Sequence, residues 1–307
     1  MNLASPWSTT SKFLFRILMK CRRLLPKKIS TAFGSIHTKN QPKIERVYVI
    51  NLDRQPDRWT NMEQELRQVL DNSGVELWNL TERYAAIDAN NFLQEPLKDK
   101  DIDPIYTLGD QLFVEPQPLA LPTKIELDSP IRMSRPEVAV ARSHIDVWRQ
   151  IKAGSHEFAL VLEDDVWFRS GFTKKMDKAW SEIQTNINNK SDFDILYLSY
   201  EEVKHGAPKN FLSNNVFCPE RGLWYLSGYV LSRKGAEKLL NLLPCKGPID
   251  LWINHQFKQL DVCAIRRPII CQRRDDSSTN SYSILPSLSK IGAINSEGAA
   301  LFHIRPR

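Results

Sequence analysis

An apolar run, Phe158 to Leu162, ends abruptly in three consecutive carboxylates, Glu163, Asp164 and Asp165. A short run of this kind predicts a buried β-strand. In open α/β sheets, ligands bind just beyond the carboxyl ends of the strands. The pattern therefore predicts an α/β fold with the three acids at the edge of its central sheet. A solvated acidic strand end is the alternative, and the abrupt change from apolar to acidic residues argues against it.

Three adjacent anions repel one another unless a cation joins them. Their oxygens suit a hard divalent ion such as Mn²⁺ or Mg²⁺, which takes further ligands from water and substrate phosphates. In an extended segment, Glu163 and Asp165 point to one side and Asp164 points to the other. We therefore expect Glu163 and Asp165 to bind Mn²⁺ or Mg²⁺, and Asp164 to contact another group.

The net charge of +6 originates in the N-terminal segment, because residues 1–44 contain nine Lys or Arg and no acid, whereas the remainder carries 33 basic and 36 acidic residues. We expect a flexible basic arm over residues 1–44. Its apolar run, residues 13–19, is far shorter than the roughly 20 residues that a spanning helix needs. A disordered leader, a targeting peptide and a peripheral contact of residues 1–30 with an anionic membrane all fit this pattern. Nucleic-acid binding is not expected, because no recognition module accompanies the basic residues.

The five cysteines form no CxxC pair and are odd in number. This pattern suits a reducing compartment and gives no zinc signature. No secretory signal is indicated either. We therefore expect a cytoplasmic location, with peripheral contact at the inner face of the membrane if the basic arm binds lipid.

The first strand of the predicted domain, residues 46–51, ends at Asn51, and a helix follows from Pro56. Arg54 and Arg58 lie at this turn, where guanidinium groups can bind a diphosphate beside a helix N-terminus. Pairing of these arginines with nearby acids is the alternative interpretation. A second short strand, residues 82–86, leads to Asp88.

Two stretches lack clear periodicity. Residues 90–134 contain six prolines and predict a long loop or insertion, either a functional lid or acceptor-binding segment or one of no chemical consequence. Residues 276–307 predict a polar, poorly packed tail. The catalytic or binding domain is therefore expected over residues 45–275.

Four later residues are candidates for the site. Ser134 and Glu137 form a capping box that opens a helix, on which Glu137 and His144 share a face. Gly228 lies inside a predicted strand, which often marks close approach of a ligand or of another part of the chain. Asp250 opens a further helix, where the helix dipole stabilises an anion. A core histidine and a helix-start aspartate are the alternatives for His144 and Asp250.

Four motifs in order resemble glycosyltransferase family 25: residues 47–59, 137–148, 160–166 and 227–240. That family includes lipooligosaccharide and collagen galactosyltransferases, and the resemblance covers roughly residues 45–275. It implies a GT-A type nucleotide-sugar-binding α/β fold, with a central mixed, mostly parallel sheet flanked by helices. It also implies a nucleotide-sugar donor, a divalent metal and inversion at the anomeric carbon. One departure is the helix start Glu137-Val-Ala-Val-Ala-Arg142, where the family usually has Glu-Ile-Gly-Cys-Ala-Leu.

The resemblance implies a metal-dependent transfer of a hexose, galactose as the family-weighted choice, from UDP-galactose to a glycan acceptor such as lipopolysaccharide or surface polysaccharide. Glu163 and Asp165 would hold the metal. Asp250 is the expected catalytic base, with Glu201 or Glu202 as competitors. The expected nucleotide-sugar contacts are Asn51, Arg54, Arg58, Asp88, Glu137, His144, Asp164 and Gly228.

Two other classes are compatible with parts of the pattern. A response-regulator receiver also has acids after an apolar strand, but it needs an acceptor Asp after a later strand, and residues 193–199 end in Ser199. A catalytically inactive, sugar-binding scaffold is favoured by the altered helix start and opposed by the intact acidic triplet.

Overall fold

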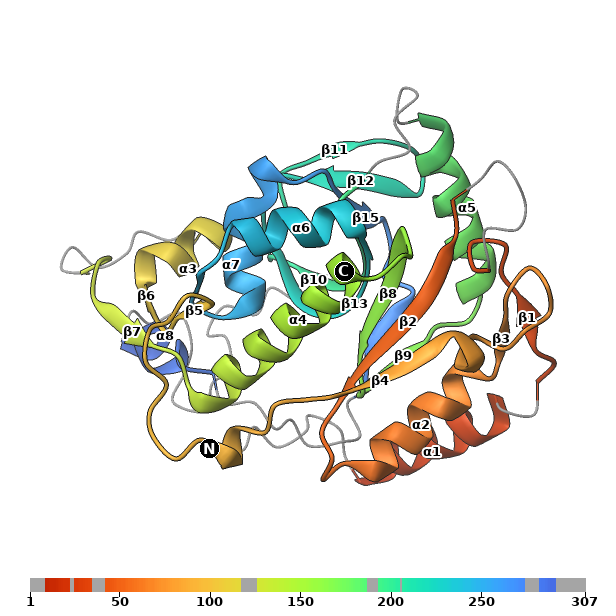
Figure 1. Cartoon of the computed structure of the whole chain (residues 1–307), viewed down its shortest axis with the longest axis horizontal. Coiled ribbons are helices and arrows are strands. Elements are labelled where there is room, and N and C mark those ends of the chain that lie inside the picture. The colour runs from red at the N-terminus through yellow and green to blue at the C-terminus, as the bar shows by residue number, and fades with distance from the viewer. Residues whose placement is uncertain are drawn as a thin grey trace.

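The computed structural model describes residues 9–22, 25–34, 42–116, 126–186, 193–204, 206–273 and 282–290. Within these ranges, the central sheet has eight strands in the order β11-β12-β15-β10-β13-β8-β2-β4 (Figure 1). The strands are β2 (Ile44–Asn51), β4 (Thr81–Ala85), β8 (Phe158–Glu163), β10 (Ile195–Glu202), β11 (Lys209–Phe211), β12 (Val216–Pro219), β13 (Leu223–Ser232) and β15 (Val262–Ile265).

The sheet is mixed. β2 pairs in parallel with β4 and β8, and β10 pairs in parallel with β15. β13 is antiparallel to β8 and β10, and β12 is antiparallel to β11 and β15. Six strands therefore run in one direction, and β12 and β13 run in the other. The prediction of a mixed, mostly parallel sheet is confirmed.

Helices cover both faces of this sheet. They are α2 (Pro56–Leu66), α4 (Arg135–Ala153), α5 (Phe172–Asn186), α6 (Arg233–Asn241) and α7 (Ile249–Gln256). Residues of β8 alternate between two apolar clusters: Val161 joins the cluster with α4, α6 and α7, whereas Leu160 and Leu162 join the cluster with α2 and α5. A strand buried on both faces is apolar at every position, which accounts for the run that precedes the acidic triplet.

The described part of residues 1–44, which the sequence predicts as a flexible basic arm, packs against the domain. α1 (Thr9–Arg22) buries Phe15 and Met19, four residues apart on one helix face, and the Phe15 ring meets the edge of Trp167 at 5.7 Å. β1 (Lys28–Ile29) pairs in parallel with β3 (Val69–Leu70). Because the segment is rich in basic residues, its sequence did not indicate that Phe15 and Met19 would be buried. None of the described helices is long and apolar enough to cross a membrane.

The proline-rich segment is an insertion with elements of its own. It contains η2 (Ala89–Asn91), β5 (Ile102–Asp103), β6 (Ile105–Thr107), α3 (Leu108–Val114) and β7 (Pro130–Arg132), and residues 117–125 lie outside the described residues. A capping box between Thr107 and Asp110 starts α3, which packs against α7. β5 pairs with β14 (Cys245–Lys246). The segment therefore borders α7, which carries Asp250 in its first turn.

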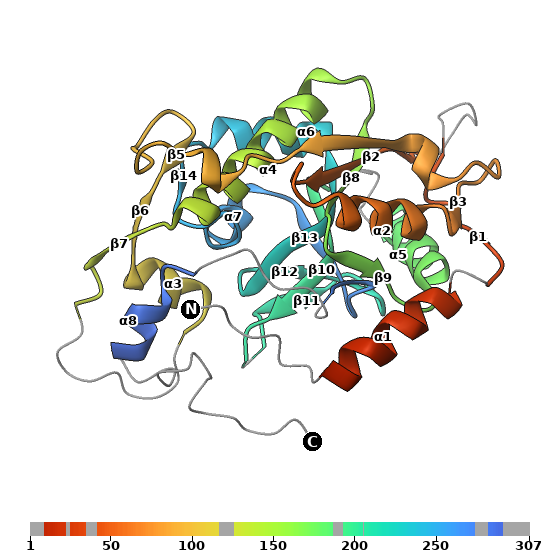
Figure 2. The ribbon, with the colours of Figure 1, turned by 90° about the horizontal axis from the view of Figure 1, so that it is seen from below.

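The described C-terminal residues also pack against the domain. β16 (Ile270–Gln272) pairs with β9 (Val166–Phe168), directly after the acidic triplet. α8 (Leu285–Lys290) follows Ile284, which is buried in the core, and lies beside α3 (Figure 2). Within the segment predicted as a polar tail, Ile284 and Leu288 thus supply apolar contacts. The rest of the predicted tail, 276–281 and 291–307, lies outside the described residues.

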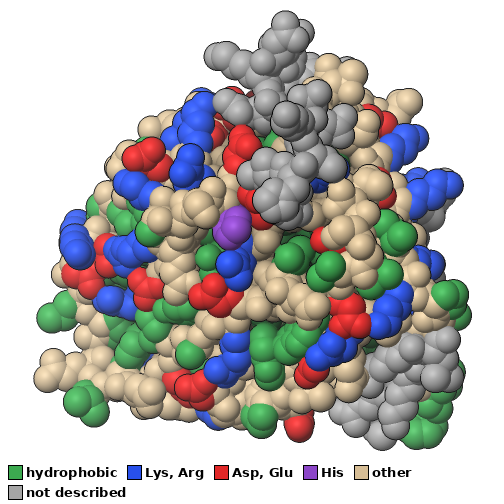
Figure 3. All heavy atoms as spheres, turned by 45° about the vertical axis from the view of Figure 1, so that its right-hand side comes forward, with side chains coloured by type: hydrophobic (Ala, Val, Ile, Leu, Met, Phe, Trp, Pro, Cys, Tyr) green, Lys and Arg blue, Asp and Glu red, His purple; other side chains and the backbone are tan. Residues whose placement is uncertain are grey.

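The short elements η1 (Leu77–Leu80) and η3 (Phe257–Gln259) complete the described fold. On the face of the molecule in Figure 3, basic and acidic side chains are interspersed over the described surface.

Candidate active site

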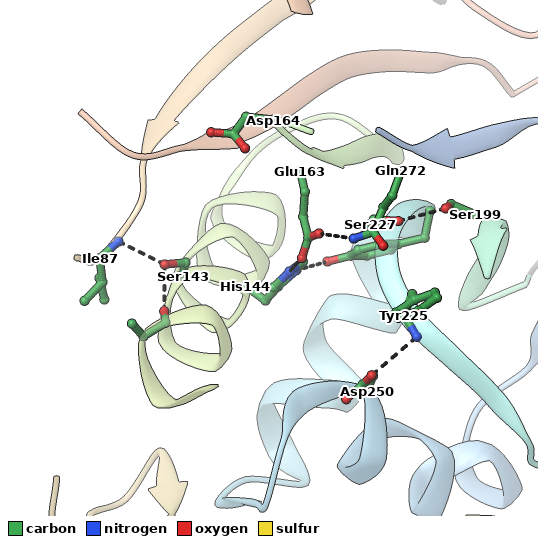
Figure 4. Close-up of polar contacts among 12 residues, drawn as sticks. Ile87, Ser143, His144, Glu163, Asp164, Ser199, Tyr225, Ser227, Asp250 and Gln272 are labelled. Carbon is green, nitrogen blue, oxygen red and sulfur yellow. Dashed lines mark hydrogen bonds and ion pairs between the residues drawn. The ribbon is translucent and has the colours of Figure 1, made fainter. Parts of the chain in front are cut away.

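Glu163 is the last residue of β8, at the carboxyl end of the strand, as predicted. Its carboxylate accepts a hydrogen bond from Gln272 Nε2 at 3.2 Å and lies 3.5 Å from His144 Nε2. Figure 4 shows Glu163 directed toward His144 and Gln272, with Asp164 on the opposite side. The predicted alternation of the first two acids is therefore confirmed.

Asp164 is buried between β8 and the β2–α2 turn. Its two oxygens accept from Asn51 Nδ2 at 2.7 Å and from Arg58 Nη1 at 3.0 Å. Burial raises the pKa of Asp164, and the contacts with Arg58 and Asn51 act against this shift. Asn51 also accepts from Arg83 Nε at 2.7 Å. Asn51, Arg58 and Asp164 were predicted to bind the donor, and in the structure they contact one another across neighbouring elements. Their direct contact with a nucleotide stays a prediction.

Arg54 and Asp88 form an ion pair of 2.6 Å across the mouth of the β2–α2 turn. The backbone N–H of Asn90 also donates to Asp88, and these two partners hold the pKa of Asp88 below its usual value against the opposing effect of burial. The segment before Asp88 is fixed to α4, because Ile87 N donates to Ser143 Oγ at 3.0 Å. Arg54 thus pairs with Asp88, and Arg58 pairs with Asp164. Contact of either arginine with a diphosphate stays a prediction.

His144 is fully buried in a polar chain behind Glu163. Its Nδ1 lies 3.0 Å from Tyr229 Oη, which accepts from Trp148 Nε1 at 2.8 Å. Since the Tyr229 oxygen already accepts from Trp148, its own proton is best directed to His144 Nδ1, which leaves a proton on Nε2 facing Glu163. His144 is therefore a buried, hydrogen-bonded histidine, as the core alternative expects, and it also lies beside Glu163. Its predicted contact with the donor stays a prediction.

Glu137 caps α4, as its spacing from Ser134 predicts. One carboxylate oxygen accepts from Ser134 N at 2.7 Å, and the other accepts from Ser283 N at 3.1 Å. Glu137 is therefore already engaged in holding the C-terminal segment on the domain, and its predicted contact with the donor stays a prediction.

Asp250 lies in the first turn of α7 and is partly buried. Its carboxylate accepts from Leu251 N at 3.0 Å and from Tyr225 N at 3.3 Å. Burial raises the pKa of Asp250 to about 6; the charges of Glu137 and Glu163 contribute, and the two backbone N–H groups oppose them. A carboxylate in this range is suited to accept a proton near neutral pH.

Tyr225 is a functional candidate that the sequence did not indicate. It has φ of 70°, unusual for a bulky residue, inside an irregular stretch of the β10–β13 pairing between Ser199 and Glu201. Its phenol hydrogen-bonds Glu201 while its N–H reaches Asp250. Glu202 instead accepts from Ala207 N at 2.6 Å, which removes it from this group.

Gly228 is explained by the structure itself. A Cβ at this position would lie 3.1 Å from two atoms of Ile270 and 3.3 Å from Ser199 Cβ. The glycine therefore makes room for β16, and its predicted contact with the nucleotide sugar stays a prediction.

Tyr282 lies among the acids, although its sequence context gave no signal for a functional residue. Burial is the main cause that raises its pKa to about 12, and four carboxylates add to the shift: Asp250, Glu163, Asp165 and Glu137. The charges of the acids predicted for metal binding and for proton transfer thus all reach Tyr282.

The donor set fits a hard divalent ion. No group of three His, Cys, Asp or Glu in the described part of the chain is arranged to hold a metal. Mg²⁺, however, is commonly bound by one or two carboxylates together with substrate phosphates. Glu163 ends β8 and Asp165 directly precedes β9, so these two carboxylates would supply such a pair. Binding of Mn²⁺ or Mg²⁺ by them stays a prediction.

The family model described as glycosyltransferase family 25 (LPS biosynthesis protein) matches residues 44–253. The chain belongs to glycosyltransferase family 25. The match includes the acidic triplet and Asp250 and ends within α7.

This family 25 chain is similar to several curated proteins. It is 22% identical over 241 residues to a glycosyltransferase 25 family member of Aedes aegypti, covering 74% of this chain and 35% of the relative. It is 26% identical over 204 residues to procollagen galactosyltransferase 2 of Homo sapiens, covering 65% and 28%. It is 25% identical over 242 residues to a Bos taurus protein named probable inactive glycosyltransferase 25 family member 3, covering 74% and 35%. The chain spans about a third of the length of these relatives.

Among solved structures, a UDP-glucose pyrophosphorylase complexed with UDP-glucose has a TM-score of 0.31 and 11% identity, covering 81% of this chain and 90% of that chain.

Proposed function

We propose that this family 25 protein is a metal-dependent, inverting glycosyltransferase of the GT-A type. It moves a hexose from a nucleotide-sugar donor to a glycan acceptor. Galactose is the sugar that the name of the procollagen galactosyltransferases suggests, and lipopolysaccharide is the acceptor that the family description suggests. UDP as the nucleotide and surface polysaccharide as an alternative acceptor follow from the resemblance of the motifs to the family.

One observation carries the proposal. Asp250, with a pKa of about 6, lies in the same carboxylate cluster as Glu163 at the carboxyl ends of the strands. Inversion needs a base that takes the proton of the acceptor hydroxyl on the face opposite the leaving group. Asp250 supplies this base, and Tyr225 fixes its orientation through the backbone hydrogen bond.

The donor side of the site is assigned to the acidic triplet. Glu163 and Asp165 would hold Mn²⁺ or Mg²⁺, and a bound ion neutralises charge on a departing nucleoside diphosphate. His144 and Gln272 hold the Glu163 carboxylate in position. Asp164, through Asn51 and Arg58, fixes the turn that follows β8 relative to β2.

The test is a panel of nucleotide sugars, offered with and without Mn²⁺ to the purified protein, with release of the nucleotide as the readout. We expect turnover of one donor that depends on the metal and is lost in Asp165→Asn. Glu201→Gln tests the competing candidate for the catalytic base, because Glu201 also contacts Tyr225.

A catalytically inactive scaffold is the second candidate, because one relative is named as probable inactive. Binding of a nucleotide sugar without turnover of any donor, by a folded protein in the presence of metal, would favour it.

A further inference from the structure

α1 has one face that packs on the domain and another that is apolar and exposed. Phe15 and Met19 are 7% and 2% exposed on the packed face. The exposed side chains are Phe13 at 63%, Leu14 at 59%, Ile17 at 42% and Leu18 at 53%. Residues four apart share a helix face, so Phe13 with Ile17 and Leu14 with Leu18 form one stripe. Single exposed apolar residues are ordinary, whereas a contiguous stripe marks an interaction surface.

The charge around this stripe identifies its partner. Residues 1–44 contain nine Lys or Arg and no acid. Lys12 on α1 and Lys28 after it are at least partly exposed. Helices that combine an apolar stripe with neighbouring cations lie in the plane of an anionic membrane interface. The excess of cations repels a second copy of the same segment, which makes a symmetric dimer through α1 unfavourable.

We propose that α1 docks this protein on an anionic lipid surface, with Phe13, Leu14, Ile17 and Leu18 entering the boundary between headgroups and acyl chains. The helix keeps its contacts with the domain in the docked state, because Phe15 and Met19 point the other way. Figure 2 shows α1 at the edge of the molecule, below β9 and α5.

The position of α1 connects the lipid surface with the candidate site. Arg22 donates to Phe168 O and lies 5.2 Å from the centre of the Trp167 ring. Trp167 belongs to β9, which begins directly after Asp165. Docking through α1 would therefore place β9, the strand that follows Asp165, on the membrane side of the molecule, which suits an acceptor carried on a lipid. This consequence rests on the proposed function, whereas the docking does not.

Vesicle sedimentation of the full chain tests the proposal. The vesicles consist of phosphatidylcholine alone or of phosphatidylcholine mixed with phosphatidylglycerol. The variant Phe13→Gln/Leu14→Gln removes half of the stripe without changing charge. Leu93→Gln/Leu97→Gln is the matched control, because these leucines are 97% and 71% exposed elsewhere on the surface.

We expect the wild type and the control to bind anionic vesicles, and less so at high salt. The α1 variant should lose at least about tenfold in partition coefficient. Equal binding by the α1 variant, or no binding by the wild type, would overturn the proposal. So would a dimer in light scattering that only the α1 variant abolishes, since a second copy would then cover the stripe. Donor turnover by the α1 variant, measured in solution, reports separately on the proposed function.

Discussion

The backbone N–H of Tyr225 donates to Asp250 Oδ2 at 3.3 Å, and Tyr225 holds this position with φ of 70°. A positive φ at a non-glycine residue costs about 1–3 kcal/mol and persists only where the surroundings impose it. The phenol of the same residue hydrogen-bonds Glu201. One strained tyrosine thus contacts both acids considered as the catalytic base.

Asp250→Asn should lower kcat by about 10²- to 10⁴-fold, because the amide cannot accept the acceptor proton. Donor binding should change little, since the acidic triplet is intact. Steady-state kinetics and calorimetric titration of the donor measure the two effects. Glu201→Gln should cost far less; the reverse ranking of the two variants would assign the base to Glu201.

Asp250→Asn should have a larger free energy of unfolding than the wild type at neutral pH. The pKa of Asp250 is raised to about 6, so the folded protein binds this proton more tightly than the unfolded chain. The contribution of Asp250 is therefore favourable at low pH and is lost as the pH rises from about 4 through about 6. At pH 7 the buried charge costs up to about 3 kcal/mol.

Urea denaturation in EDTA at several pH values measures this difference. The gain in the free energy of unfolding of Asp250→Asn should shrink toward pH 4. Asp53→Asn, at a side chain that is 79% exposed, should show no such trend. If the gain in the free energy of unfolding were the same at every pH, the pKa of Asp250 would not be raised by burial.

Replacing the two arginines of the β2–α2 turn should change the free energy of unfolding by very different amounts. Arg58→Ala leaves Asp164 buried without its cation and should cost about 3–5 kcal/mol of unfolding free energy. Arg54→Ala breaks an ion pair whose arginine is 42% exposed, which is worth about 0–1 kcal/mol. Chemical denaturation compares them, and equal costs would argue against a structural role for Asp164.

Gly228→Ala should destabilise the protein by about 1–3 kcal/mol, because the new methyl group meets Ile270 at 3.1 Å. Ile270→Val removes one of the two contacting carbons, so the double variant should recover part of the loss. Thermal melts of the three variants give the coupling. Strict additivity would indicate that Ile270 is not the obstacle.

Local patterns predicted the parts of the site that depend on neighbours in sequence. The apolar run before Glu163 gave β8, the alternation gave opposite directions for Glu163 and Asp164, and Ser134 with Glu137 gave the start of α4. Each of these follows from strand or helix periodicity.

Long-range contacts were beyond such patterns. Nothing local to Asp164 identifies Asn51 and Arg58 as its partners, and the pairing of Arg54 with Asp88 spans two strands. Tyr282 lies in a stretch whose polar composition predicted poor packing. Ile284, two residues later, is buried in the core and anchors the segment. The packing of the N-terminal helix on the domain was not predicted for the same reason, because its few buried apolar residues are surrounded in sequence by many cations.

The most direct test of the central claim is calorimetric titration of UDP into the protein with Mn²⁺ and with EDTA, for the wild type, Asp165→Asn and Asp53→Asn. Asp53 provides a matched control because it lies just after β2 at the same sheet edge and is 79% exposed. The account predicts metal-dependent binding of UDP that is lost in Asp165→Asn and kept in Asp53→Asn. Binding of UDP that is equal with Mn²⁺ and EDTA, or unchanged in Asp165→Asn, would contradict a donor site built on the acidic triplet.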